Sequence, residues 1–226
     1  MDSHSNRGQL FRHLDGLVTA PVAFSLYKGG IIDLLKQQKI TTLSFICQQI
    51  KVNEGYLNVA LRVLASQGFI DYKLNPSDGE LTITRNEKSL IAFHYFKWYQ
   101  QVVEFIQFTG NFHPRKFEVE PFLKQRLLFD NYKNRFDFPI PKNPIEKEVQ
   151  DQMLLHIEGC IVAPTLVRLG MNGMFHKYFM ETRFKPEEFH QYPDHFTEIL
   201  DFFCHLGWFT EKNGFYQFTE SGLFFA

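Results

Sequence analysis

Residues 15–21 are Asp-Gly-Leu-Val-Thr-Ala-Pro, and residues 158–164 are Glu-Gly-Cys-Ile-Val-Ala-Pro. The second stretch begins 143 residues after the first, and at the same offset Gly30 corresponds to Gly173. Both stretches continue into apolar sequence. A glycine followed four residues later by Ala-Pro is a specific pattern, so its recurrence is the first sign of an internal repeat.

The similarity continues to the end of each copy. Residues 61–70 resemble residues 200–209 at an offset of 139, so the second copy is four residues shorter between its helices. Short β-like tracts then follow at residues 81–84 and 216–219. A colinear series of matches is much less expected by chance than a single match. We therefore interpret the chain as a duplication of one structural unit.

The first copy carries start and stop signals for its helices. Residues 15–35 are largely helical in pattern, and Pro21 predicts a break or kink within them. Thr42 and Asn53 are residue types that cap helix N-termini, and Gly68 is typical of a helix end. The helices predicted after the two caps are residues 43–49 and 54–67, and the second places three apolar side chains on one face: Leu57, Leu61 and Leu64.

Each copy ends in a predicted β-hairpin. In the first copy, residues 69–72 and 81–84 are strand-like, and residues 75–79 have the composition of a turn. In the second copy the turn shortens to residues 212–214, Lys-Asn-Gly, and Asn-Gly is a strong hairpin signal. Two helices with a short connection, followed by a hairpin, predict a winged helix in each copy.

The predicted fold is mainly α with small β wings. Two winged-helix-like repeats occupy residues 1–88 and 144–226, and a helical, aromatic-rich connector with a proline-containing linker occupies residues 89–143. Residues 90–108 are helical in pattern but apolar nearly all round, which predicts burial. Two interpretations stay open: this segment packs the two copies together, or it forms an interface with a partner. The candidate interface residues are Trp98, Phe105 and Phe108.

Composition excludes several classes of protein. The 24 Lys and Arg residues nearly balance the 25 Asp and Glu residues, so no global basic field exists to attract nucleic acid or an anionic membrane. No apolar run reaches about 18 residues, and the first residues do not resemble a signal peptide. Cys47, Cys160 and Cys204 are too sparse for a disulfide framework or a zinc site. We expect a cytoplasmic protein with reduced thiols and no membrane segment.

DNA binding is the first function to weigh for a winged helix. A recognition helix needs Arg, Lys, Asn or Gln toward base edges and cations toward phosphates. Residues 54–62 offer one acid and one base, Glu54 and Arg62, whereas residues 193–201 hold three acids and neither Lys nor Arg. Affinity for DNA rests largely on phosphate neutralisation. DNA binding is therefore a poor hypothesis for the first copy and a poorer one for the second.

Catalytic signatures are missing from the sequence. It contains no Gly-x-Gly, so neither a dinucleotide fingerprint nor a glycine-rich cofactor loop is present, and no HExxH, GxSxG or P-loop motif occurs. The nearest cluster of metal-ligating residue types is His190, His195, Cys204 and His205. Nothing fixes four of these ligands in tetrahedral order, so we expect surface or packed histidines. No catalytic, cofactor-binding or metal-binding residue is assigned in this chain.

The opening helices with Ala20-Pro21, followed by a winged helix without DNA-reading charge, resemble the N-terminal region of class I S-adenosylmethionine-dependent methyltransferases. The tandem arrangement is more particular. Residues 53–70, 159–164, 204–208 and 219–224 resemble the start of methyltransferase regions at the head of polyketide synthase loading modules, those of apratoxin- and saxitoxin-type assembly lines. The resemblance covers nearly the whole chain.

The resemblance implies a non-catalytic lid or adaptor that covers a substrate channel and positions a C-terminal methyltransferase core. S-adenosylmethionine, with a metal ion as a further candidate, would bind in that core and not in this chain. The partners implied are the core itself and an acyl carrier protein that presents a short acyl group. The apolar residues 224–226 predict that the native chain continues. Two alternatives stay open: a tandem winged-helix DNA-binding regulator, and a stand-alone protein-interaction module.

Overall fold

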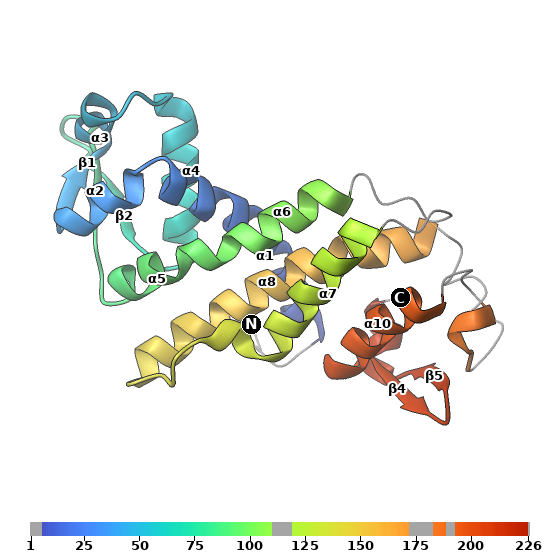
Figure 1. Ribbon diagram of the computed structural model, residues 1–226. Coiled ribbons are helices and arrows are strands. Elements are labelled where there is room, and N and C mark those ends of the chain that lie inside the picture. Colours follow the sequence, from blue (N-terminus) through green and yellow to red (C-terminus); the bar gives the residue numbers. More distant parts are fainter. Residues whose placement is uncertain (1–5, 110–118, 172–182, 189–192, 226) are drawn as a thin grey trace. The chain divides into compact units, whose positions relative to one another are not determined.

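The computed structural model describes residues 6–109, 119–171, 183–188 and 193–225 (Figure 1). The chain divides into two compact units, each built from separate stretches of sequence. The first-repeat unit comprises residues 14–103 and 138–157, and the second-repeat unit comprises residues 1–13, 104–137 and 158–226. Three helices contribute residues to both units: α1 (Asn6–Lys28), α6 (Tyr99–Thr109) and α8 (Pro144–Met171).

The first-repeat unit has the element order of a winged helix. After α1 follow α2 (Ile31–Gln37), β1 (Ile40–Thr42), α3 (Leu43–Gln49), α4 (Glu54–Ser66), β2 (Asp71–Leu74) and β3 (Leu81–Thr84). Then come α5 (Ser89–Tyr95) and the short 3-10 helix η1 (Phe96–Trp98). The strands form an antiparallel sheet in the order β1-β3-β2, in which Ile83 lies opposite both Thr41 and Tyr72.

The second-repeat unit repeats this plan in reduced form. It contains α7 (Val119–Lys133), the 3-10 helices η2 (Arg135–Asp137) and η3 (Pro186–Glu188), α10 (Pro193–His205), β4 (Phe209–Lys212), β5 (Phe215–Phe218) and α11 (Glu220–Phe225). Strands β4 and β5 form the antiparallel hairpin. Phe184 forms an isolated antiparallel bridge with Tyr216. Phe184 lies 143 residues after Thr41 of β1, so this bridge is the counterpart of the β1–β3 pairing.

Local signals in the sequence account for the helix ends. The Thr42 hydroxyl accepts a hydrogen bond from the Phe45 amide, and the Asn53 side chain accepts one from Tyr56, so both predicted caps are confirmed. Gly68 and Gly207 both take positive φ, 73° and 77°, where α4 and α10 end. The predicted apolar face of α4 is buried and consists of Leu57, Leu61 and Leu64. The equivalent residues of α10 are also buried: Phe196, Leu200 and Phe203.

The break expected near Pro21 lies elsewhere. Helix α1 continues through Pro21 to Lys28, and the chain turns by 75° between residues 11–28 and 31–37. Proline costs a helix one backbone hydrogen bond, and a helix that is packed along its length tolerates that loss. Gly30, at φ 78°, takes the left-handed conformation that a sharp turn requires.

The fold class is confirmed: the described residues are mainly helical, with two small antiparallel sheets. The connector is helical as expected, although it consists of several shorter helices, α5, η1, α6 and α7. The domain ranges 1–88, 89–143 and 144–226 describe the sequence repeat and stay a prediction. The compact units are divided at other positions, inside α1, α6 and α8, because these long helices extend from one unit into the other.

Candidate functional site

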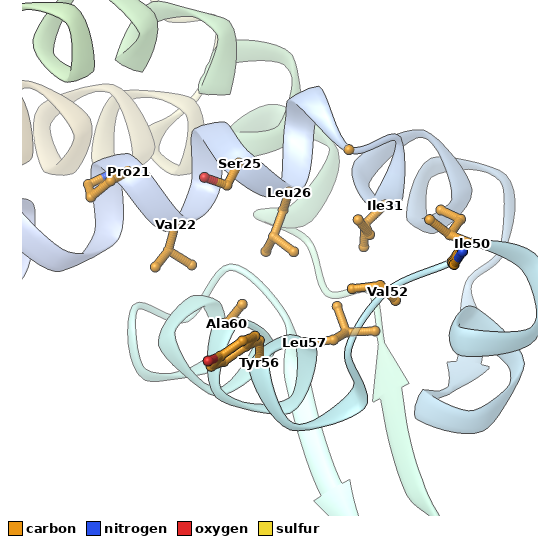
Figure 2. Close-up of a pocket in the computed structure, with 12 residues that line it drawn as sticks. Pro21, Val22, Ser25, Leu26, Ile31, Ile50, Val52, Tyr56, Leu57 and Ala60 are labelled. Carbon is orange, nitrogen blue, oxygen red and sulfur yellow. The ribbon is translucent and has the colours of Figure 1, made fainter.

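A hollow of about 430 Å³ opens in the first-repeat unit between α1, α2, α4 and residues 50–52 (Figure 2). Val22 and Leu26 of α1 form one wall, and Tyr56, Leu57 and Ala60 of α4 face them. Apart from Ser25, Lys51 and Gly29, every lining residue is apolar or aromatic. A concave, mostly apolar hollow with few polar groups is the usual form of a binding site.

The sequence of α1 explains why this face is apolar. From Gly16 to Tyr27 the helix carries no charged residue, so both its buried and its exposed faces are uncharged. Val18 is 53% exposed, and on α4 Tyr56 and Val59 are 79% and 58% exposed. This face can bind apolar groups, and Ser25, Lys51 and Tyr56 are the polar groups that line it.

A buried polar contact joins three helices of the second-repeat unit. His13 Nε2 of α1 lies 2.7 Å from Glu158 Oε1 of α8, where both side chains are almost fully buried. The Tyr132 hydroxyl of α7 donates a hydrogen bond to Oε2 of the same carboxylate. Burial, together with the negative charge of Glu158, raises the pKa of Tyr132 well above its ordinary value. The ring centroids of Trp208 and His13 are 5.8 Å apart. His13 and Glu158 are therefore enclosed by the core, which they stabilise, and are closed to substrates.

The first-repeat unit holds a second buried histidine, His156 of α8. Its Nε2 lies 3.0 Å from Gln67 Oε1, which can only accept, so the ring proton is on Nε2 and Nδ1 accepts a hydrogen bond from the Tyr99 hydroxyl at 2.8 Å. Burial lowers the pKa of His156 to about 4, so the ring is neutral near pH 7. His13 and His156 lie 143 residues apart and occupy equivalent positions in the repeat.

This pair of histidines was not singled out from the sequence. A signal was present, because His13 precedes Gly16 by three residues and His156 precedes Gly159 by the same spacing. The hollow between α1 and α4 was also not foreseen. The packing of α1, α2, α4 and residues 50–52 creates it.

The predicted interface residues have different environments. The half-buried Trp98 has its ring 6.0 Å from that of Phe138 in the first-repeat unit. Phe105 belongs to the second-repeat unit and is 7% exposed, so little of it is available to a partner. Phe108 lies in α6, but its side chain is outside the described part of the chain. The interface role of the three residues stays a prediction.

The histidine cluster is only partly described. His190 lies outside the described residues, and His195 is placed on α10 without a described side chain. His205 is exposed, and burial with the charge of Asp201 raises the pKa of Cys204 to about 11. Within the described ranges, no group of three or more His, Cys, Asp and Glu side chains could hold a metal ion.

The helices in the recognition position differ in charge. On α10, Glu198 forms an ion pair with Arg126 at 3.5 Å, and Asp201 accepts a hydrogen bond from the Tyr216 hydroxyl at 2.6 Å. On α4, the exposed residues include the uncharged Tyr56 and Val59 together with Glu54 and Arg62. Neither helix presents the row of cations that phosphate contacts require.

In the part of the chain that the structure describes, no single helix is long and apolar enough to span a membrane.

Two family models match parts of the chain. Residues 6–72 match the AprA N-terminal domain, and residues 158–226 match the AprA winged helix domain. The first match covers α1 to α4, and the second covers the end of α8, α10 and the β4–β5 wing. No curated protein matches the chain. The two matches identify a winged-helix, AprA-like region.

Proposed function

We propose that this chain is the non-catalytic lid or adaptor region of an S-adenosylmethionine-dependent methyltransferase in a polyketide synthase loading module. It covers the substrate channel and positions a C-terminal methyltransferase core. A separate lid excludes water and orients the substrate during transfer. The observation that carries the proposal is the pair of matches to the AprA N-terminal and winged helix domains on one chain.

The chemistry of the described residues supports a non-catalytic role. The buried side chains of His13, Glu158 and His156 are hydrogen-bonded to neighbouring side chains and closed to substrate. The open hollow between α1 and α4 is apolar. An apolar hollow of this kind can bind and position a partner.

S-adenosylmethionine does not fit the residues of this chain. Among the described residues, the β4–β5 sheet is an antiparallel hairpin, and the other sheet is a hairpin, β2–β3, to which β1 is added. The sequence contains no Gly-x-Gly turn. We therefore assign the cofactor, and any metal ion, to the C-terminal core. The substrate is a short acyl group on an acyl carrier protein, and the carrier protein is a partner of the assembled enzyme.

The first experiment is to read the native coding sequence beyond Ala226. The proposal expects a following strand–loop–helix with a glycine-rich cofactor loop. A stop codon shortly after Ala226 would contradict the lid function and favour a stand-alone interaction module.

A second experiment tests the interface residue Trp98 in the full-length enzyme. We expect Trp98→Ala to lower methyl transfer to a short acyl thioester about tenfold or more, because a small misplacement of the reacting groups is costly. Leu90→Ala, at an exposed position of α5, is the matched control and should leave the rate unchanged. An unchanged rate for Trp98→Ala, at full folding by thermal melting, would exclude Trp98 from the interface.

A further inference from the structure

Equivalent surfaces of the two repeats are covered to different extents. On the opening helices, Val18 of α1 is 53% exposed, whereas its counterpart Ile161 of α8 is fully buried. On the recognition helices, Val63 of α4 is partly exposed and its counterpart Phe202 of α10 is buried. The same two faces are therefore closed in one repeat and open in the other.

Helix α7 packs against α10 in the second-repeat unit, and its Tyr132 also contacts α8. Figure 1 shows α7 running beside α8. Phe129 stacks on Phe202 of α10 with ring centroids 4.4 Å apart, and Arg126 pairs with Glu198 one turn earlier. Tyr132 reaches α8 and donates its hydroxyl hydrogen to Glu158. Leu128 and Phe129 of α7 are buried, and Phe129 and Tyr132 cover Phe202 of α10, so this side of α7 occupies the surface that α10 presents.

The corresponding groove in the first-repeat unit lies between α1 and α4. Val59, the counterpart of Glu198, is 58% exposed, and Tyr56 beside it is 79% exposed. Asp15, the counterpart of Glu158, is exposed. The hollow lined by Val22 and Ala60 deepens this groove (Figure 2). Single exposed apolar residues are ordinary, but several of them beside an apolar hollow indicate a binding surface.

We propose that the α1/α4 groove binds an amphipathic helix of a partner protein. That helix presents leucine and aromatic side chains on one face, as α7 does with Leu128, Phe129 and Tyr132. Its apolar side chains enter the hollow beside Tyr56, and a hydroxyl donor faces Asp15. This is the helix-in-groove mode of recognition. The inference rests on the comparison of the two repeats and holds whether or not the partner is a methyltransferase core.

The probe is a fluorescein-labelled synthetic peptide with the sequence of residues 119–133, titrated with the intact chain and followed by fluorescence anisotropy. We expect saturable binding that Val59→Arg weakens about tenfold or more, because the substitution places a charge in the apolar groove. Leu74→Arg adds the same charge at an exposed apolar position on β2 and should bind like the wild type. A peptide with Leu128→Ala and Phe129→Ala should not bind.

Three results would overturn the proposal. The first is the absence of saturable binding to the wild-type chain. The second is equal binding to the wild type and to Val59→Arg, which would place the peptide elsewhere, for example in the groove that α7 occupies. The third is a dimer in sedimentation velocity that Val59→Arg dissociates, which would make a second copy of the chain the occupant. Circular dichroism of both variants confirms that they are folded.

Discussion

Gly16 of α1 packs directly against the backbone of His156 of α8. A Cβ atom built on Gly16 would overlap the His156 carbonyl oxygen and lie 2.6 Å from its Cα. The repeat produces the same contact a second time, because a Cβ atom on Gly159 of α8 would lie 2.5 Å from the Cα of His13 of α1. Each glycine is thus required by a close approach of two helix backbones. The His-x-x-Gly spacing occurs in both copies, so the two contacts are equivalent in the repeat.

Gly16→Ala should destabilise the chain strongly. The added methyl group meets backbone atoms, which cannot rotate away, so the helices must separate and lose packing along their contact. We expect a loss of about 3 kcal/mol in the free energy of unfolding, at the upper end of overpacking substitutions. Urea unfolding followed by circular dichroism measures it.

Gly55→Ala is the matched control for that substitution. Gly55 lies in the first turn of α4, where the nearest neighbour of an added Cβ is the Asn53 side chain at 3.3 Å. Alanine favours a helix more than glycine by roughly 1 kcal/mol, so this variant should be as stable as the wild type or more stable. Equal stability of the Gly16→Ala and Gly55→Ala variants would contradict the close approach.

Glu158→Gln should also cost stability. The substitution removes the charged acceptor shared by His13 and Tyr132 and leaves buried donors with a weaker partner. We expect a loss of about 2 kcal/mol. Asp33→Asn, in the exposed pair with Lys36, should cost at most about 0.5 kcal/mol and serves as the comparison. If the two variants lose the same amount, the buried contact contributes nothing specific.

His156 should make the chain less stable in mild acid. Its pKa falls from 6.5 to about 4 on folding, so between these values the unfolded state binds a proton that the folded state does not. Above about pH 6.5 both states are neutral and the residue adds no pH dependence. As the pH falls below 6.5, stability is lost with a slope of up to about 1.4 kcal/mol per pH unit.

The measurement for this prediction is urea unfolding at several pH values between 7.5 and 4.5, for the wild type and His156→Gln. The glutamine variant should be less stable at pH 7.5, and its stability should decline less steeply toward pH 4.5. Parallel declines would show that other groups are responsible for the acid sensitivity.

Duplex DNA should not bind to this chain. In an electrophoretic mobility assay at about 50 mM salt, where nonspecific binding is favoured, micromolar protein should leave the duplex unshifted. Arg62→Glu should change nothing. A shift that this substitution abolishes would instead support the tandem winged-helix regulator, because Arg62 is the one base that α4 carries.

Local sequence was enough for the elements whose ends depend on neighbouring residues. Thr42 and Asn53 bond amides only three residues away, so their roles as caps follow from residue type and position. Asn213 and Gly214 take positive φ in the second hairpin, as Asn-Gly predicts. The duplication was also visible, because two copies of one fold keep glycines and apolar residues at matching positions.

Contacts between distant residues had to come from the tertiary structure. Strand β1 is only three residues long and becomes a strand because β3 pairs with it. Helix α1 continues through Pro21 because tertiary packing outweighs one lost hydrogen bond. Nothing local to His13 or Glu158 indicates that these residues, 145 apart in the sequence, meet in the fold.

The two copies differ for the same reason. Their sequences specify the same helices and hairpin, since caps, turns and apolar periodicity act over a few residues. Whether a groove between two of those helices is filled depends on where a third helix packs, and α7 packs on α10 and leaves α4 exposed. Burial is a property of residues brought together from far apart, so folding alone decided which copy keeps an open surface.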